Sequence, residues 1–103
     1  MRIEHYSVEK LKDEILNIVA KYLDISEYKV FFFGSRVSGK GTDHSDIDIG
    51  IEGSSPISPE IKLKIEEEIE NLPILYKIEI VDFKRVPPKF REVALQNREF
   101  ITL

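Results

Sequence analysis

The chain has 103 residues and a formal net charge of −4, with 42% hydrophobic and 33% charged residues. This length suits one small domain over residues 1–103, and the composition excludes a disordered chain. The acidic balance argues against tight nucleic-acid binding as the main role, and the absence of cysteine excludes disulfides and thiolate metal sites. No apolar run reaches the ~20 residues that span a bilayer, and the N-terminus lacks the apolar segment of a signal peptide, so we expect a cytoplasmic protein.

The first two elements expected are a long helix and a buried strand. Ser7 is a suitable N-cap for a helix that runs to about Asp24, with apolar residues at helical spacing along one side. This stripe predicts that the helix lies flat on a sheet. Residues 29–33 then form an almost unbroken apolar run, which is typical of a strand buried on both faces.

Gly34 and Ser35 follow this strand at a point where a helix could begin. Backbone N–H groups and the Ser35 hydroxyl at such a point can hold a phosphate chain. Arg36 could neutralise charge on the phosphates, although a salt bridge is an equally ordinary role for it. Residues 34–40 also fit the first seven positions of a P-loop, but Gly41 stands where Ser or Thr should hold Mg²⁺. Turn-forming residues follow instead of a helix, so we reject the P-loop interpretation.

The second strand, residues 46–52, alternates acidic residues with isoleucines. Asp46 and Asp48 therefore point to one face of the sheet and the isoleucines to the other. Two neighbouring carboxylates repel each other, and their pKa values rise unless a cation lies between them. Carboxylate oxygens suit Mg²⁺, which one or two carboxylates commonly hold together with substrate phosphates. A metal site facing a phosphate site is the arrangement that phosphoryl or nucleotidyl transfer needs.

A turn-rich link over residues 53–58 leads to a second long helix. Ser58 is the expected N-cap, Pro59 occupies the first helical position, and Pro73 stops the helix. Apolar residues again recur at helical spacing, which predicts a second helix packed on the sheet.

The third strand, residues 76–81, offers the further carboxylate that a metal-dependent transfer needs as a metal ligand or proton acceptor. Glu79 lies between isoleucines, as Asp48 does, so its parity places it on the carboxylate face. Asp82 has the opposite parity unless a bulge intervenes. We choose Glu79, with Asp82 as the alternative. Lys77 shares the face of Glu79, where it could meet a phosphate or form a cross-strand ion pair.

The C-terminal part is expected to contain a short amphipathic helix and one further segment. The helix begins at about Pro88, with Phe90, Val93 and Ala94 directed inward. Residues 99–103 either add an edge strand to the sheet or dock on a partner.

The central motif resembles a known family. An apolar strand, Gly34-Ser35, the ten residues 36–45 and then Asp46-Ile47-Asp48 resemble the signature of the DNA polymerase β-type nucleotidyltransferases. The short chain makes it most similar to the minimal nucleotidyltransferase proteins of bacteria and archaea, and the resemblance extends from the first helix through Phe83. It implies an α+β fold of the polymerase β-like type, with helices packed on one face of a small mixed β-sheet.

The resemblance also implies an activity and a partner. These small proteins are often antitoxins paired with a helical HEPN-domain ribonuclease, so the implied reaction is transfer of AMP from ATP to a tyrosine hydroxyl of that toxin. Two Mg²⁺ ions and the nucleoside triphosphate are the implied ligands. The implied catalytic and metal-binding residues are Asp46, Asp48 and Glu79, and the implied phosphate-binding residues are Gly34, Ser35 and Arg36.

Larger relatives have an additional domain that covers the nucleotide base and chooses the acceptor, and this chain has no residues left for one. We therefore expect the carboxylate face to be open and a second subunit to complete the site, either a HEPN-type partner or another copy of the chain. Two alternatives stay open. The domain could neutralise a helical partner by occlusion without catalysis, or it could act on a small molecule.

Overall fold

The computed structural model describes residues 1–39 and 45–102. Lys40 and Gly41, which entered the P-loop comparison, lie outside the described residues. Within the described part of the chain, no helix is both long and apolar enough to cross a membrane. The helices are α1 (Val8–Ala20), α2 (Ser35–Ser38), α3 (Pro59–Glu70) and α4 (Pro88–Ala94), and the strands are β1 (Tyr28–Phe33), β2 (Ile47–Gly53), β3 (Ile78–Asp82) and β4 (Glu99–Phe100).

The strands form one mixed sheet in the order β3-β2-β1-β4. β1 pairs antiparallel with β2 and with β4, whereas β2 pairs parallel with β3. The predicted small mixed sheet in an α+β fold is therefore confirmed. Of the two roles considered for residues 99–103, the edge strand is confirmed by the pairing of Phe100 with Phe31.

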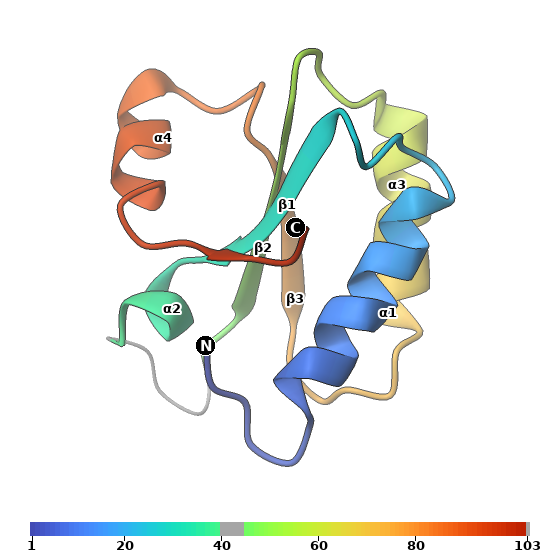
Figure 1. The fold of residues 1–103 in the computed structure, drawn as a ribbon, viewed down its shortest axis with the longest axis vertical. Coiled ribbons are helices and arrows are strands. Elements are labelled where there is room, and N and C mark those ends of the chain that lie inside the picture. Colours follow the sequence, from blue (N-terminus) through green and yellow to red (C-terminus); the bar gives the residue numbers. More distant parts are fainter. Residues whose placement is uncertain (40–44, 103) are drawn as a thin grey trace.

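Helices α1 and α3 lie side by side on one face of the sheet (Figure 1). The Ser7 side chain accepts a hydrogen bond from the backbone N–H of Lys10 at 3.2 Å, and Ser58 caps α3 in the same way. α1 ends at Ala20, earlier than predicted, and the N–H groups of Lys21 and Tyr22 donate to carbonyls three residues back. The Asp24 carboxylate then accepts the backbone N–H of Ser26 in a turn.

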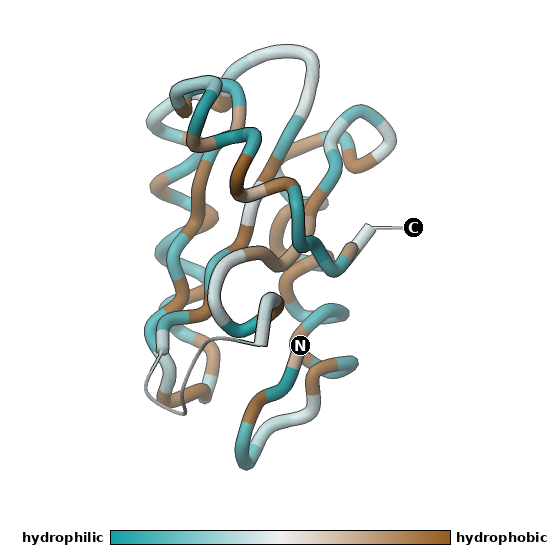
Figure 2. Tube along the Cα trace, turned by 90° about the vertical axis from the view of Figure 1, so that its left-hand side faces the viewer, coloured by the Kyte–Doolittle hydropathy of each residue, from teal (hydrophilic) through white to brown (hydrophobic). Residues whose placement is uncertain are grey.

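The main core lies between these two helices and the sheet, where hydrophobic residues run through the central strands (Figure 2). The isoleucines of β2 lie in this core, as the alternation with carboxylates predicts. The side chains that are buried here are Leu11, Ile15, Ile18, Val19, Val30, Phe32, Ile47, Ile49, Ile51, Ile57, Ile65, Ile69, Ile80 and Ile101.

The sequence predicts that the opposite face of the sheet is open, but part of this face is covered. Helix α4 lies on this side (Figure 1), and beneath it Phe31, Phe33 and Phe83 form a second buried cluster. The ring centroid of Phe83 lies 5.0 Å from that of Phe31 and 5.1 Å from that of Phe33, both in edge-on geometry. The prediction that helices pack on one face therefore holds for α1 and α3 only.

Gly50 of β2 makes this second cluster possible. A Cβ atom at Gly50 would lie 2.4 Å from the ring of Phe31 and 2.6 Å from that of Phe83. The two rings therefore occupy the space above the strand that any other side chain would fill. Polar side chains can occupy this face only where these rings do not cover it.

Candidate active site

Carboxylates from two neighbouring strands lie in register on this available part. Asp48 of β2 lies opposite Glu79 of β3 in the parallel ladder, and opposite Phe33 of β1 on its other side. Asp46 precedes the first residue of β2 and shares the parity of Asp48. The register thus brings Glu79 beside Asp48, as the alternation with isoleucine predicts.

The environment of Asp48 disfavours its charged form. Partial burial, followed by repulsion from Glu79 and Asp46, raises the pKa of Asp48 to about 6. Among residues 1–39 and 45–102, no positive charge contributes to the pKa shift of Asp48. A cation placed among the three groups would remove the repulsion, so the electrostatics fit a divalent metal ion.

Gly34 brings the backbone into direct contact with Asp48. Its φ of 85° lies in the left-handed region, and an added Cβ would lie 2.2 Å from Oδ2 of Asp48. Glycine is therefore required here for two separate reasons. As a result, the start of α2 is held against the carboxylate of the neighbouring strand.

The helix that follows Gly34 is a single short turn. α2 spans four residues, the Ser38 hydroxyl donates to the Ser35 carbonyl at 3.2 Å, and Gly39 ends the turn with a φ of 81°. The predicted helix start after the first strand is confirmed. The turn begins directly after Gly34, so the backbone of Ser35 follows the residue that contacts Asp48.

Arg36 holds the segments around the site together. Its Nε donates to the Ser45 carbonyl at 2.8 Å, and one terminal nitrogen donates to the Arg2 carbonyl at 3.1 Å. The guanidinium also lies over the ring of Tyr76, 4.4 Å from its centroid. Arg36 therefore connects α2 to the start of β2, to the N-terminal segment and to the start of β3. Its predicted contact with phosphates stays a prediction.

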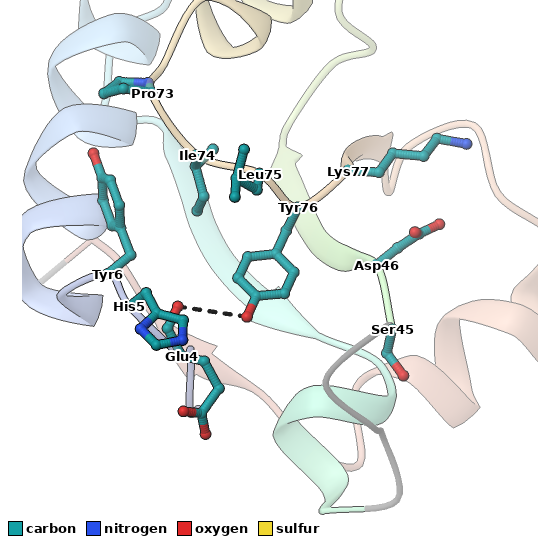
Figure 3. A pocket seen from close by; sticks show the side chains of 10 residues that line it. All are labelled: Glu4, His5, Tyr6, Ser45, Asp46, Pro73, Ile74, Leu75, Tyr76 and Lys77. Atoms are coloured by element: carbon teal, nitrogen blue, oxygen red, sulfur yellow. Dashed lines mark hydrogen bonds between the residues drawn. The ribbon is translucent and has the colours of Figure 1, made fainter.

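A pocket of about 660 Å³ lies beside Asp46, between the N-terminal segment and the approach to β3. Figure 3 shows the Tyr76 ring directed toward Glu4, whose carbonyl accepts a hydrogen bond from the tyrosine hydroxyl at 3.4 Å. In the same view, the side chains of Asp46 and Lys77 extend away from the Tyr76 ring. The shared orientation of Lys77 and Asp46 agrees with the parity expected from the sequence.

Asp82, the alternative third carboxylate, has a different position and different contacts. It is 4% exposed and accepts hydrogen bonds from the backbone N–H groups of Ile57 at 2.8 Å and Lys84 at 2.9 Å. Its Oδ2 also lies 3.3 Å from Nε of Arg85. Asp82 therefore fastens the segment before α3 to the turn after β3, away from Asp48.

A second pocket, of about 450 Å³, lies between the carboxylates and α4. Its walls include Asp48 and Glu79 at one end and Phe90 and Val93 of α4 at the other. Val93 is 60% exposed and does not pack inward as predicted. Phe90 is 44% exposed, but its ring lies against the buried rings of Phe33 and Phe83, on the side that the sequence predicts. Ala94 also packs against the buried phenylalanines, as predicted.

Sequence reasoning missed this wall because a helix of seven residues does not reveal what its apolar side faces. Phe90 and Val93 are three residues apart, which is the spacing of one helix side. That signal predicts an apolar stripe but does not distinguish packing on the sheet from lining a pocket.

The metal-binding potential of the site depends on side-chain rotation. Among residues 1–39 and 45–102, no three His, Asp or Glu side chains converge closely enough to hold one metal ion. The donor set of Asp46, Asp48 and Glu79 nevertheless has the oxygen ligands that Mg²⁺ prefers. Their side chains would have to turn toward the ion as it binds.

The sequence matches a known family over most of its length. The profile of the family described as "Polymerase beta, Nucleotidyltransferase" matches residues 13–102. The chain belongs to this family, and the protein is a nucleotidyltransferase. A curated relative, "Probable protein adenylyltransferase MntA" of Haemophilus influenzae, is 29% identical over 85 residues, which are 81% of this chain and 75% of that protein.

Solved structures confirm the fold. A toxin–antitoxin crystal structure with AMP-PNP superposes with a TM-score of 0.70 at 13% identity, over 87% of this chain and 71% of that chain. A tri-AMPylated Shewanella oneidensis HEPN toxin in complex with MNT antitoxin gives a TM-score of 0.67 at 13% identity, over 91% and 71%. A structure described as a minimal nucleotidyltransferase gives 0.58 at 20% identity, over 92% and 96%. These likenesses establish the polymerase β-like nucleotidyltransferase fold.

Proposed function

We propose that the protein uses Mg²⁺ and ATP to transfer AMP to a tyrosine hydroxyl of a HEPN-type toxin, and that it acts in this way as an antitoxin. The observation that carries the proposal is the in-register pair of Asp48 and Glu79, with Gly34 packed against Asp48. The similarity to an MntA adenylyltransferase and to an MNT antitoxin bound to an AMPylated HEPN toxin supports this choice of nucleotide and acceptor.

The residues divide into a metal-binding set and a phosphate-binding set. Asp46, Asp48 and Glu79 would hold the metal, with two ions expected from the chemistry of nucleotidyl transfer. Bound Mg²⁺ supplies positive charge that offsets the charge on the phosphates. The backbone of Gly34 and the backbone and hydroxyl of Ser35 would hold the β- and γ-phosphates. Arg36 would add positive charge at that end while it braces the surrounding segments.

The order of the strands suits an in-line displacement. Gly34 follows β1, Asp48 belongs to β2 and Glu79 to β3, so these residues follow one another across the sheet. The tyrosine oxygen forms a bond to the α-phosphorus, and the bond from that phosphorus to the oxygen bridging the β-phosphate breaks. Pyrophosphate leaves on the Gly34 side, and the hydroxyl proton passes to Glu79 on the other side.

The test is to co-express the chain with a HEPN-type partner encoded beside it and to analyse the partner by mass spectrometry. We expect the mass of AMP on a partner tyrosine, and no modification when the chain carries Asp48→Asn or the partner tyrosine is replaced by phenylalanine. A stable complex in which wild type leaves the partner unmodified would support occlusion instead. Efficient transfer to a free small molecule, with no complex formed, would overturn the antitoxin role.

A further inference from the structure

The pocket between the carboxylates and α4 has two chemically different ends. One end is polar and is formed by Gly34, Ser38, Asp48 and Glu79. The other end is mainly apolar, with two amide side chains at its border. The residues of this second end are Phe90, Val93, Ala94, Gln96 and Asn97, and the sheet residues Phe33 and Val81, which neighbour Asp48 and Glu79, complete the lining.

The apolar end is a preformed wall. The Phe90 ring centroid lies 6.2 Å from that of Phe33 and 6.1 Å from that of Phe83, so buried aromatic rings support it from below. Phe90 remains 44% exposed and Val93 60% exposed on the pocket side of this support. A flat, uncharged ring placed there would cover apolar surface without displacing any core residue.

A ligand that suits this pocket presents a phosphate chain together with its Mg²⁺ to Asp48 and Glu79 beside Gly34, and a flat ring to Phe90. A nucleotide carries both groups in one molecule. An acceptor tyrosine brings a ring but no phosphate, so it leaves the Gly34 end of the pocket unfilled. The volume of about 450 Å³ also lies within the range of small-molecule sites.

We propose that α4 is the nucleoside-binding wall of the enzyme. The base lies against Phe90 and Val93, and the side-chain amides of Gln96 and Asn97 contact its polar edge. This inference rests on the proposed function, because it takes the triphosphate of the same substrate to lie at Gly34. It assigns the choice of base to a segment that follows all the catalytic strands in the chain.

The chain offers a closely matched control for Phe90. Phe100 is 45% exposed and packs edge-on against Phe31 of the same aromatic cluster, at 6.0 Å between centroids, but it does not line the pocket. Phe90→Ala and Phe100→Ala should therefore cost similar stability. Only Phe90→Ala should weaken nucleotide binding.

Binding to the full-length chain is measured by calorimetry with Mg²⁺ and a non-hydrolysable ATP analogue, and separately with inorganic triphosphate. We expect Phe90→Ala to bind the ATP analogue about tenfold more weakly than wild type, because base stacking on an aromatic ring is lost. Its affinity for inorganic triphosphate, which has no base, should be unchanged. Phe100→Ala should match wild type with both ligands.

Two further variants keep the test decisive if Phe90→Ala unfolds. Phe90→Leu retains apolar bulk but lacks a flat face and should show the same selective loss for the ATP analogue. Asn97→Ala, at an exposed position, should reduce the preference for the ATP analogue over the corresponding GTP analogue at least threefold.

Equal binding of the ATP analogue by wild type, Phe90→Leu and Asn97→Ala would overturn the inference while leaving the proposed function intact. If Phe90→Leu and Asn97→Ala changed only the KM for the acceptor, the pocket would belong to the acceptor, and the inference would also be overturned. Wild type that binds neither ligand would refute both proposals. If the wild type bound the ATP analogue and the variants weakened this binding as expected, but the wild type transferred no AMP to the partner, the proposed function alone would be refuted.

Discussion

The sheet face that carries the site is divided into two parts with opposite properties. In one part, Asp48 and Glu79 lie in register as like charges, and the pKa of Asp48 is raised. In the other part, Phe31 and Phe83 pack over Gly50 and are shielded from water. The first part opposes folding through repulsion, and the second favours folding through burial. A single sheet face thus combines a costly reactive site with the packing that offsets its cost.

The strongest test of this contrast is Asp48→Asn. We expect transfer to the partner to fall about a thousandfold or more, because the substitution removes the negative charge of a proposed metal ligand. The melting temperature at pH 7 without Mg²⁺ should rise by a few degrees, because the cost of burying the charge and the repulsion from Glu79 and Asp46 both disappear. Labelled AMP transfer and thermal unfolding of the same preparation check both. A large drop in melting temperature would show that the carboxylate has a structural role.

The next test compares the two acidic residues of β3. Glu79→Gln should lower transfer about a hundredfold with little change in stability. Asp82→Asn should change transfer only a few-fold but should lower the free energy of unfolding by about 1–3 kcal/mol, because Asp82 accepts one buried and one partly buried backbone hydrogen bond. Urea unfolding and initial rates at 20 °C separate the effects. The reverse ranking would place the third functional carboxylate at Asp82.

On the phenylalanine side, Gly50→Ala should be purely destabilising. The new methyl group would meet Phe31 and Phe83 rings that are buried and have no space to move, at a cost of about 1–3 kcal/mol. The control is Gly53→Ala, whose methyl group would come equally close to the Tyr28 ring. Tyr28 is only partly buried and can turn aside, so the control should cost less. Equal losses in urea unfolding would contradict this difference.

The smallest expected effect is ligand-induced stabilisation of the carboxylate part. ATP at ten times its dissociation constant for the Mg²⁺-loaded chain should add about 1.4 kcal/mol to the stability of that chain. Mg²⁺ and ATP together should stabilise the chain by more than the sum of their separate effects. The reason is that the phosphates complete the coordination of Mg²⁺. Thermal unfolding with neither, either and both ligands measures this coupling, and Asp48→Asn should abolish it. Strictly additive shifts would argue against a shared site.

The sequence predicted the carboxylate part better than the aromatic part, for a physical reason. Alternation along a strand has a period of two, so the faces of Asp48 and Glu79 could be inferred without knowing what covered them. The position of α4 depends on contacts between residues far apart in the chain, among them Phe33 with Phe90. No local pattern encodes such a contact, and the expectation of an open face was wrong for that reason.

The helix ends show the same limit on a smaller scale. The caps at Ser7 and Ser58 are local hydrogen bonds and were predictable. The early end of α1 is followed by the turn between Asp24 and Ser26, which the apolar stripe does not reveal. The contacts of Arg36 with Arg2 and Tyr76 likewise join three separate segments, and the sequence offered only the general alternatives of phosphate or salt bridge.

The two glycines that flank α2 differ in the genetic variation they can accept. Every missense change at Gly34 adds a Cβ that collides with Asp48, in addition to the strain of a positive φ. At Gly39 the φ is also positive, but an added Cβ meets no atom of residues 1–39 and 45–102 within 4 Å. Asparagine, which adopts this conformation at modest cost, is therefore an acceptable replacement at Gly39 alone. Over evolutionary time, the residue that follows α2 can change, whereas Gly34, which precedes α2, is restricted to glycine.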